Sequence, residues 1–467
     1  MAYASTTRTN GAIRNPYTLL ALVGALFLVA QLTLFSHQRA ASWDEALYLS
    51  QVDPEIPALR FTASRARGIV LLVAPLSFAG VGLGAIRVAL TIASSAMVII
   101  AYACWVPLLR AIAALAAAMF ATTWVALFYG GEVMPNLWSA LLITAALGTA
   151  LRPSTRGRSL LAAGFLATTA LVRPLDAVAA TIVIAVILGR RGDRRAATYM
   201  VGGCLLGILP WVVEMSVRFG GPIQAIATAT EVAHVRVGVW ENVVRHLDMT
   251  DGPTTGTVAQ PSPAVIGVIW WLALGVVCTI AAVAPSSGVR RVAARAAIAA
   301  GLALATPYLF AVSGAAPRFL LPAYALLAVP SAIGLGAVWS RRRSLAPIIV
   351  AAAVLWIAWN LRVADGVEGA IGRNRSTSAQ VGRALRALVG GDACALVSSD
   401  NFAQIAFASR CEGLPLDADP GFTWLAAHGQ DGSRFVLLRG GQTPGGAGRE
   451  LRYLMTLDPD WRVYALG

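Results

Sequence analysis

Long apolar runs recur along the first three quarters of the chain and decide what it can fold into. They are roughly 17–24 residues long, about the length an α-helix needs to cross a ~30 Å hydrocarbon layer. Hydrophobic residues make up 57% of the 467 residues, and charged residues make up only 13%. Two or three soluble domains would not show this pattern. The sequence therefore predicts a polytopic, mostly α-helical membrane protein.

The runs place eleven membrane spans, and we interpret the first as a retained span. It is longer than the apolar core of a signal peptide and lacks a small-x-small cleavage site before the polar stretch that follows. The spans lie at about 17–36, 85–107, 111–129, 134–151, 159–173, 174–189, 196–219, 264–284, 295–313, 319–339 and 345–361.

The basic residues report the orientation of these spans. All 37 are arginine, the formal net charge is +14, and Arg-rich connectors recur between predicted spans. Because basic connectors stay in the cytoplasm, the sequence predicts a multi-pass protein of the cytoplasmic (inner) membrane. Its N-terminus is cytoplasmic and its C-terminal region periplasmic or extracellular, so the charge does not indicate a nucleic-acid partner. The connectors are residues 8–14, 110, 152–158, 190–195, 290–295 and 341–343.

Three non-spanning regions then fall outside the membrane. Residues 37–84 hold a polar loop and the run 69–85, which Pro75 and several glycines interrupt, so we expect an interfacial or re-entrant helix. Residues 220–263 form a long loop with helical character at 223–247.

The third region, residues 362–467, is expected to be a small soluble α/β domain that follows a catalytic membrane domain of residues 1–361. Residues 393–399 and 434–440 resemble short buried strands, and 378–391 resembles an amphipathic helix. Its only cysteines, Cys394 and Cys411, lie 17 residues apart in a compartment that should be oxidising, which predicts a disulfide. The cysteines in the predicted spans are expected to be inert packing: Cys104, Cys204 and Cys278.

The predicted topology gathers ionisable side chains at the outer face, where such groups are costly unless they pair or face water. Asp44 and Glu45 follow the first span, in the stretch "WDEALYL" that also holds Trp43 and Tyr48. The other charged candidates lie in external turns or near the outer end of a span: Glu132, Arg173, Asp176, Glu214 and Arg318.

Some of these charges have a purely structural explanation. Glu132 precedes a helix start, where an acid favours the helix dipole, and Arg173 with Asp176 can form an ion pair within one turn. Asp44 and Glu45 are harder to explain in this way, because adjacent carboxylates repel each other.

Carboxylates and arginines on one water-facing surface suit a group transfer. A carboxylate can take the proton of an attacking hydroxyl, and arginines can hold a phosphate leaving group through charge-assisted hydrogen bonds. A divalent cation held by carboxylates is an alternative for the second role. The sequence lacks the HExxH, GxSxG, phosphate-loop and paired CxxC motifs of metalloproteases, serine hydrolases, NTPases and zinc sites.

In this order, "WDEALYL", "GGEVMPNLW", "LVRPLDAV" and "APRFLLPAYALLAVP" resemble the GT-C glycosyltransferases, over roughly residues 17–361. The likeness is to the branch of protein O-mannosyltransferases and lipid A aminoarabinose transferases. It implies an enzyme of the glycosyltransferase class that moves a sugar from a polyprenyl-phosphate donor to a hydroxyl of a lipid, glycan or protein at the outer face, with inversion.

The resemblance also implies roles for individual residues. Asp44 would be the catalytic base with Glu45 in support, and Glu132 would shape the pocket or, with Asp44, hold Mg²⁺ or Mn²⁺. Arg318 would meet the lipid phosphate. The further substrate-binding candidates are Tyr48, Arg60, Arg65, Arg67, Arg173 and Asp176.

Two other classes stay open on the sequence. A lipid or glycan transporter or flippase would place charges near the bilayer midplane and often contains repeats, whereas here the candidates gather at one face. A membrane-anchored cell-envelope assembly protein would work through residues 362–467, and its outer-face carboxylates would be dispensable.

Overall fold

The computed structural model describes residues 15–63, 65–232, 239–248, 265–284, 288–312, 315–416, 421–427, 433–440, 451–458 and 460–466. The chain divides into two compact units, each built from segments far apart in the sequence. The first comprises Met1–Phe35, Ala63–Gly68 and Val88–Glu368. The second comprises Ser36–Thr62, Ile69–Arg87 and Gly369–Gly467.

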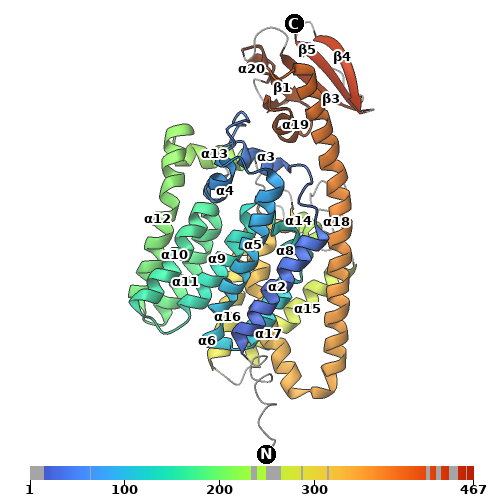
Figure 1. Ribbon diagram of the computed structural model, residues 1–467. Coiled ribbons are helices and arrows are strands. Elements are labelled where there is room, and N and C mark those ends of the chain that lie inside the picture. Colours follow the sequence, from blue (N-terminus) through green and yellow to red (C-terminus); the bar gives the residue numbers. More distant parts are fainter. Residues whose placement is uncertain are drawn as a thin grey trace, which may run out of the picture. The chain divides into compact units, whose positions relative to one another are not determined.

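The first unit is helical (Figure 1), and a helix lies at each of the predicted spans. Its helices are α2 (Pro16–Leu34), α5 (Leu83–Ala103), α6 (Val106–Leu109), α7 (Ile112–Ala121), α8 (Trp124–Tyr129), α9 (Pro135–Ala150), α10 (Arg156–Val172), α11 (Pro174–Arg190), α12 (Arg194–Arg218), α13 (Pro222–Val232), α14 (Val239–Asp248), α15 (Val265–Val283), α16 (Gly288–Phe310), α17 (Leu321–Arg341) and α18 (Ala346–Val389), with the 3₁₀ turns η2 (Pro317–Leu320) and η3 (Arg343–Leu345). α5 and α18 contribute to both units.

Among the described residues, seven helical segments are long and apolar enough to cross a membrane. The chain is therefore a multi-pass membrane protein, as predicted, while α7 to α11 are shorter than these segments. The seven are Pro16–Leu34, Leu83–Ala103, Arg194–Arg218, Val265–Val283, Gly288–Phe310, Pro317–Arg341 and Arg343–Val389.

Two of the predicted elements differ in detail. The span predicted at 111–129 is split into α7 and α8, because Thr123 caps the second helix with its side chain. The helical stretch predicted at 223–247 is two helices, α13 and α14; residues 233–238 and 249–264 lie outside the described residues.

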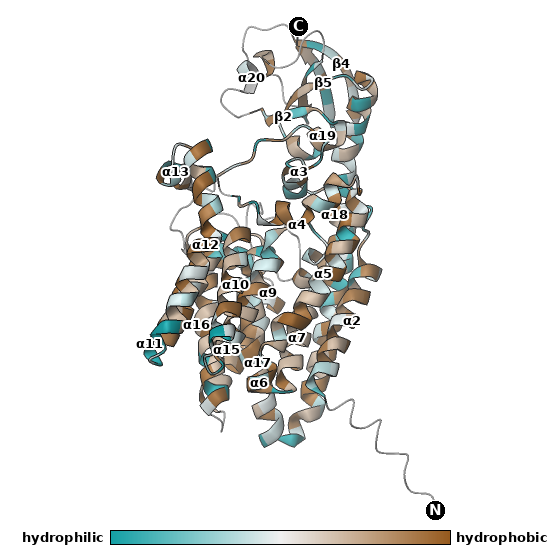
Figure 2. Cartoon of the chain, turned by 60° about the vertical axis from the view of Figure 1, so that its left-hand side comes forward, coloured by the Kyte–Doolittle hydropathy of each residue, from teal (hydrophilic) through white to brown (hydrophobic). Residues whose placement is uncertain are grey.

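The burial pattern of the first unit fits a bundle in lipid. α9 is buried on all sides, which marks it as a central helix, and most of α17 is buried as well. Figure 2 shows hydrophobic residues along the outer helices. On α12, for example, Leu205, Leu206 and Leu209 are each more than half exposed.

Two glycines let α12 approach α10 closely. A Cβ atom on Gly203 would lie 2.4 Å from the carbonyl oxygen of Ala163, and one on Gly207 would lie 2.0 Å from that of Ala167. Small residues spaced by four allow such backbone contact between membrane helices. The sequence "GCLLG" therefore sets the packing of this helix pair.

The second unit contains a five-stranded sheet in the order β2-β1-β3-β5-β4. Its strands are β1 (Ala395–Ser398), β2 (Glu412–Pro415), β3 (Arg434–Arg439), β4 (Leu451–Asp458) and β5 (Trp461–Leu466). β1 pairs in parallel with β2 and β3, and β5 pairs antiparallel with β3 and β4. β1 and β3 confirm the two predicted strands.

Helices from two parts of the chain complete this unit. They are α3 (Trp43–Leu49), α4 (Gly68–Phe78), α19 (Phe402–Ser409) and α20 (Gly421–Ala427), together with the end of α18. α4 lies in the run where an interfacial or re-entrant helix was predicted, with Pro75 inside it. The amphipathic helix predicted at 378–391 is the last part of the 44-residue α18. Cys394 and Cys411 form a disulfide that joins the residues just before β1 and β2.

Candidate functional site

The two adjacent carboxylates of "WDEALYL" lie in the first turn of α3. Ser42 caps this helix: its hydroxyl accepts a hydrogen bond from the Glu45 amide at 3.2 Å, and the Ser42 amide donates to Glu45 Oε2 at 2.9 Å. This reciprocal arrangement is a capping box. Because successive helix positions point about 100° apart, the neighbours have different surroundings: Glu45 is fully buried and Asp44 is partly exposed.

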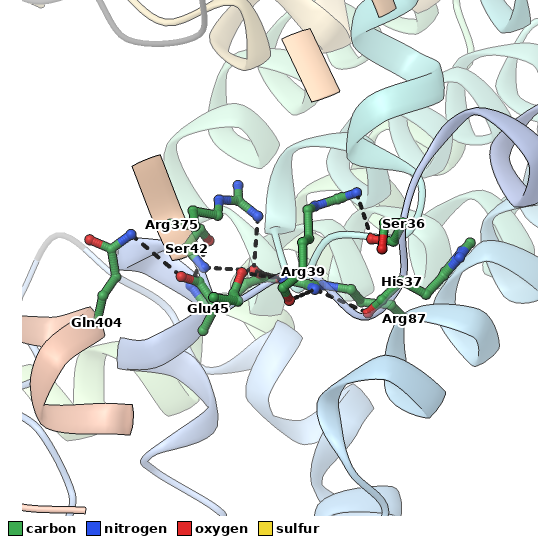
Figure 3. Close-up of polar contacts among 10 residues, drawn as sticks. Ser36, His37, Arg39, Ser42, Glu45, Arg87, Arg375 and Gln404 are labelled. Carbon is green, nitrogen blue, oxygen red and sulfur yellow. Dashed lines mark hydrogen bonds and ion pairs between the residues drawn. The ribbon is translucent and has the colours of Figure 1, made fainter. Parts of the chain in front are cut away.

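The buried Glu45 carboxylate is held by Arg87 (Figure 3). Arg87 Nε donates to Oε1 at 3.0 Å, and Nη2 donates to Oε2 at 2.6 Å. Arg375 adds a second cation, with Nη1 3.5 Å from Oε2. A buried carboxylate is tolerated when it is paired and its remaining lone pairs are satisfied. Glu45 meets that condition, so its contacts are those of a structural anchor for α3.

Arg87 also fixes the loop that leads into α3. Its guanidinium donates to the backbone carbonyls of His37 at 3.2 Å and Ala40 at 3.1 Å, and to that of Arg39. One buried side chain thus joins the start of α5, the loop and the helix that carries Asp44. Sequence reasoning missed Arg87 and Arg375. A signal existed for Arg87, since it is a lone charge within an apolar predicted span.

Other candidates in the 37–84 region have separate surroundings. Tyr48 is buried, with its ring against Phe61 at a centroid distance of 5.9 Å. Arg60 is exposed and belongs to the second unit, whereas Arg65 and Arg67 belong to the first.

Glu214, also singled out in the sequence, is the partner of Arg67. Arg67 Nε donates to Glu214 Oε1 at 2.8 Å, and Arg218 Nη1 donates to the same oxygen at 3.1 Å. These contacts join the segment 63–68 to the end of α12.

The structure brings Arg173 and Arg318 into one stack with two aromatic rings, although the residues come from distant turns. Arg173 lies over the Tyr308 ring at 5.6 Å, Tyr308 stacks on Phe319 at 5.1 Å, and Arg318 lies over Phe319 at 5.1 Å. Each guanidinium gains a cation–π contact. We call Arg173, Tyr308, Phe319 and Arg318 the arginine–aromatic stack.

Asp176 fixes one end of this stack. Its Oδ2 accepts from Arg173 Nε at 2.7 Å and from the Ser139 hydroxyl at 2.9 Å, while its Oδ1 accepts from the Tyr308 hydroxyl at 2.8 Å. The Tyr308 hydroxyl also contacts Arg173 Nη2. Arg173 is extended because it precedes Pro174, and this starts α11 with Asp176 in its first turn. The intra-turn ion pair considered from sequence is therefore present and extends to α9 and α16.

Glu132 lies in the buried turn between α8 and α9 and is fully buried. The turn is tight: the Met134 amide donates to the Glu132 carbonyl at 2.7 Å. Nearby, a Cβ atom on Gly130 would lie 1.8 Å from Gln31 Oε1, so a side chain here would require the buried Gln31 side chain to move.

A buried histidine lines a small cavity in the first unit. His246 on α14 is 2% exposed, and no described residue forms a hydrogen bond with its Nε2. Burial lowers the pKa of His246 to about 4, against the opposing effect of a hydrogen bond with the Tyr308 backbone. The imidazole is therefore neutral at pH 7. Thr123, Trp124, Val125, Trp270, Pro317, Tyr324, Trp356 and Asn360 line the rest of the cavity.

The described residues do not form a complete metal site. Among them, no three His, Cys, Asp or Glu side chains lie together in a way that could hold an ion. Of the two carboxylates considered for a cation from the sequence, Asp44 belongs to the second unit and Glu132 to the first.

No protein-family model matches the sequence, and no curated protein matches it. Solved structures of GT-C superfamily glycosyltransferases share its fold. ArnT from Cupriavidus metallidurans bound to undecaprenyl phosphate matches with a TM-score of 0.64 at 14% identity, over 95% of this chain and 97% of that one.

For two other similar structures, the match covers a smaller share of the neighbour's chain. The archaeal oligosaccharyltransferase AglB from Archaeoglobus fulgidus, in complex with an inhibitory peptide and a dolichol-phosphate, matches with a TM-score of 0.53 at 12% identity, over 90% of this chain and 69% of that one. The arabinofuranosyltransferase AftD from Mycobacteria matches with a TM-score of 0.54 at 13% identity, over 96% and 40%. The GT-C fold that the sequence predicted is confirmed.

Proposed function

We propose that this chain is a membrane glycosyltransferase that moves a sugar from a polyprenyl-phosphate donor to an acceptor hydroxyl. The observation that carries the proposal is the GT-C fold, which extends over 95% of the chain in the match to ArnT bound to undecaprenyl phosphate. AglB was solved with a related lipid, a dolichol-phosphate. The arrangement of charged side chains in this chain supports the same donor class.

Asp44 is the proposed catalytic base. It lies in the first turn of a capped helix, and the residue is partly exposed. Asp44 would take the proton of the acceptor hydroxyl as the oxygen attacks the anomeric carbon of the donor. The bond between that carbon and the phosphate oxygen breaks in the same step. A single displacement of this kind inverts the anomeric centre.

The arginine–aromatic stack supplies the proposed phosphate contact. Arg318 is partly exposed at the η2 turn, with one face of its guanidinium against Phe319. A planar cation of this kind binds phosphate oxygens in a bidentate manner and stabilises the charge that develops on the leaving polyprenyl phosphate. Arg173, held by Asp176 and Tyr308, would add a second positive charge to that surface.

Whether transfer requires a divalent cation can be tested by chelation. A bound Mg²⁺ or Mn²⁺ would polarise the donor phosphate, and Asp44 and Glu132 are the carboxylates proposed from the sequence to bind it. Full transfer in EDTA would exclude a required cation. A loss restored by Mg²⁺ or Mn²⁺ would assign one.

We further propose that transfer occurs at the outer face of the cytoplasmic membrane. Arg-rich connectors inside give a cytoplasmic N-terminus and an outer C-terminal domain. A reporter enzyme active only outside the cytoplasm, fused after Gly467, should be active. A reporter fused after Arg342, in a predicted cytoplasmic connector, should be inactive.

A donor panel tests the proposed function directly. Purified protein in lipid would be incubated with polyprenyl-phosphate-linked hexoses, pentoses and amino sugars, and release of free polyprenyl phosphate would be measured with lipid, glycan or peptide acceptors. We expect release with one donor class only, dependent on acceptor. No release with any donor, while the protein moves lipids between leaflets, would favour a flippase instead.

A further inference from the structure

The segment around Asp44 shares one hydrophobic core with the C-terminal part of the chain. Ala41, Ala46, Leu47 and Leu59 are buried within that core. Its other members come from α18, β1, α19, β3 and β5 and from the disulfide: Val381, Leu385, Cys394, Leu396, Phe402, Ala403, Ile405, Ala406, Cys411, Phe435, Leu437, Trp461 and Val463. The second unit thus buries one face of α3 in its own interior.

Specific contacts join α3 to α19. The rings of Trp43 and Phe402 meet edge to face at a centroid distance of 4.7 Å. The side-chain amide of Gln404 donates to the carbonyl of Ala41 at 3.4 Å, and Gln404 is buried. The partners of α19 in these two contacts, Trp43 and Ala41, lie one and three positions before Asp44 in the sequence.

A charged contact joins α3 to α18. Arg375 is buried, and its guanidinium approaches the Glu45 carboxylate at 3.5 Å, while Arg87 binds the same carboxylate from α5. Two cations from two helices therefore hold one anion of α3 (Figure 3). Arg375 lies in the stretch of α18 beyond the predicted last span, so it belongs to the C-terminal domain by sequence and by packing.

A helix as short as α3 cannot keep its orientation alone. It has seven residues, and isolated helices shorter than about 12 residues are unstable in water. The direction of the Asp44 side chain is thus set by what α3 packs against. The partners within the second unit are Arg87, Arg375 and α19.

We infer that the C-terminal domain is part of the catalytic apparatus, with Arg375 and Phe402 as positioning residues that orient Asp44 through Glu45 and Trp43. This inference rests on the proposed role of Asp44. It gives residues 369–467, the part of this domain that lies in the second unit, a function in transfer itself, in place of a separate binding task. A catalytic centre built in this way cannot be separated from the domain by truncation.

The test compares Arg375→Gln with Arg373→Gln, an exposed arginine on the same helix. Hydrogen exchange of the amides of residues 42–50 is measured in the full-length protein in lipid, together with transfer kinetics. For Arg375→Gln we expect roughly tenfold faster exchange in this segment and a fall of about tenfold or more in kcat with donor KM unchanged. Arg375→Lys should restore part of both, and exchange in α9 should not change.

The readouts separate this inference from the proposed function. If Asp44 is not the base, Arg375→Gln still exchanges faster than Arg373→Gln in residues 42–50, while the two variants transfer sugar at the same rate. If exchange in α3 and kcat are the same in Arg375→Gln as in Arg373→Gln, the positioning role is wrong.

If Arg375→Gln does not fold, a second variant, Phe402→Leu, tests the same positioning role. Phe402→Leu retains apolar volume and removes the ring edge that meets Trp43. Faster exchange limited to residues 42–50 supports the inference. Unchanged exchange and kcat in this variant overturn it.

Discussion

Arg87 and Glu45 form a two-bond ion pair whose side chains are 1% and 0% exposed. The pair lies where α3, α5 and the loop between α2 and α3 meet. Because Arg87 also binds three backbone carbonyls of that loop, the pair fixes the path of the chain on both sides of Asp44. The position of Asp44, the proposed base, therefore depends on this buried ion pair.

Replacing Arg87 with glutamine should destabilise the protein by about 3–5 kcal/mol, because it leaves the Glu45 carboxylate buried without its main partner. Differential scanning fluorimetry or denaturant unfolding in detergent measures this loss. Arg383→Gln, at an exposed position of α18, is the matched control and should change little. The double variant Arg87→Gln with Glu45→Gln should lose less than the sum of the two single losses. Additive losses would show that the pair does not act as a unit.

Gly207→Ala should weaken the packing of α12 on α10, since the new Cβ atom would meet a backbone oxygen at 2.0 Å. We expect a loss of about 1–3 kcal/mol. Gly202→Ala is on the same helix, and its new Cβ atom would meet nothing within 4 Å. This control should be neutral or slightly stabilising, because alanine favours the helix. Unfolding midpoints of both variants in the same detergent check the difference. Equal midpoints would contradict the close helix contact.

His246 should make stability depend on pH below neutrality. Its folded pKa of about 4 is below the ordinary value of 6.5, so the unfolded chain takes up the proton first as the pH falls. The stability tied to the neutral imidazole is complete above pH 6.5 and is lost as the pH falls toward 4, on the order of 2 kcal/mol between pH 7 and pH 5.

Comparing wild type with His246→Gln isolates this effect, since the other titrating groups are common to both. The variant should show a shallower fall in unfolding midpoint between pH 7 and pH 5. Parallel pH profiles would show that His246 is not buried in its neutral form.

Arg318→Ala should raise the donor KM by roughly 10- to 100-fold, because a charged hydrogen bond to phosphate contributes about 1.5–3 kcal/mol. Arg318→Lys should recover only part of this, since lysine keeps the charge but lacks the planar fork and the contact with Phe319. Arg342→Ala, at an exposed position just before η3, serves as the control. An unchanged donor KM in Arg318→Ala would remove this residue from the phosphate site.

The sequence predicted the helices well because each apolar run is a local signal with a length set by the membrane. The strands β1 and β3 and the Arg173–Asp176 pair were also visible, since alternation, burial and a spacing of three are local patterns. The second unit was less predictable. It takes α3 and α4 from an early loop and combines them with residues after 369, and no local pattern records that association.

The same reasoning explains the missed site residues. Arg375 contacts Glu45 across most of the length of the chain, and Tyr308 and Phe319 resemble ordinary apolar residues of a span and a turn. Their roles follow from which helices are neighbours. Periodicity and composition do not carry that information, whereas the charge of Arg87 within an apolar run did.

The rate of sugar transfer by Asp44→Asn tests the central claim most directly, with Asp392→Asn, an exposed acid of the C-terminal domain, as the control. Asparagine preserves the size of the side chain and removes its ability to take a proton. We expect kcat to fall by about 10²-fold or more, with unchanged unfolding midpoint and donor binding. Transfer by Asp44→Asn at the rate of the Asp392→Asn control would contradict the assignment of Asp44 as the base.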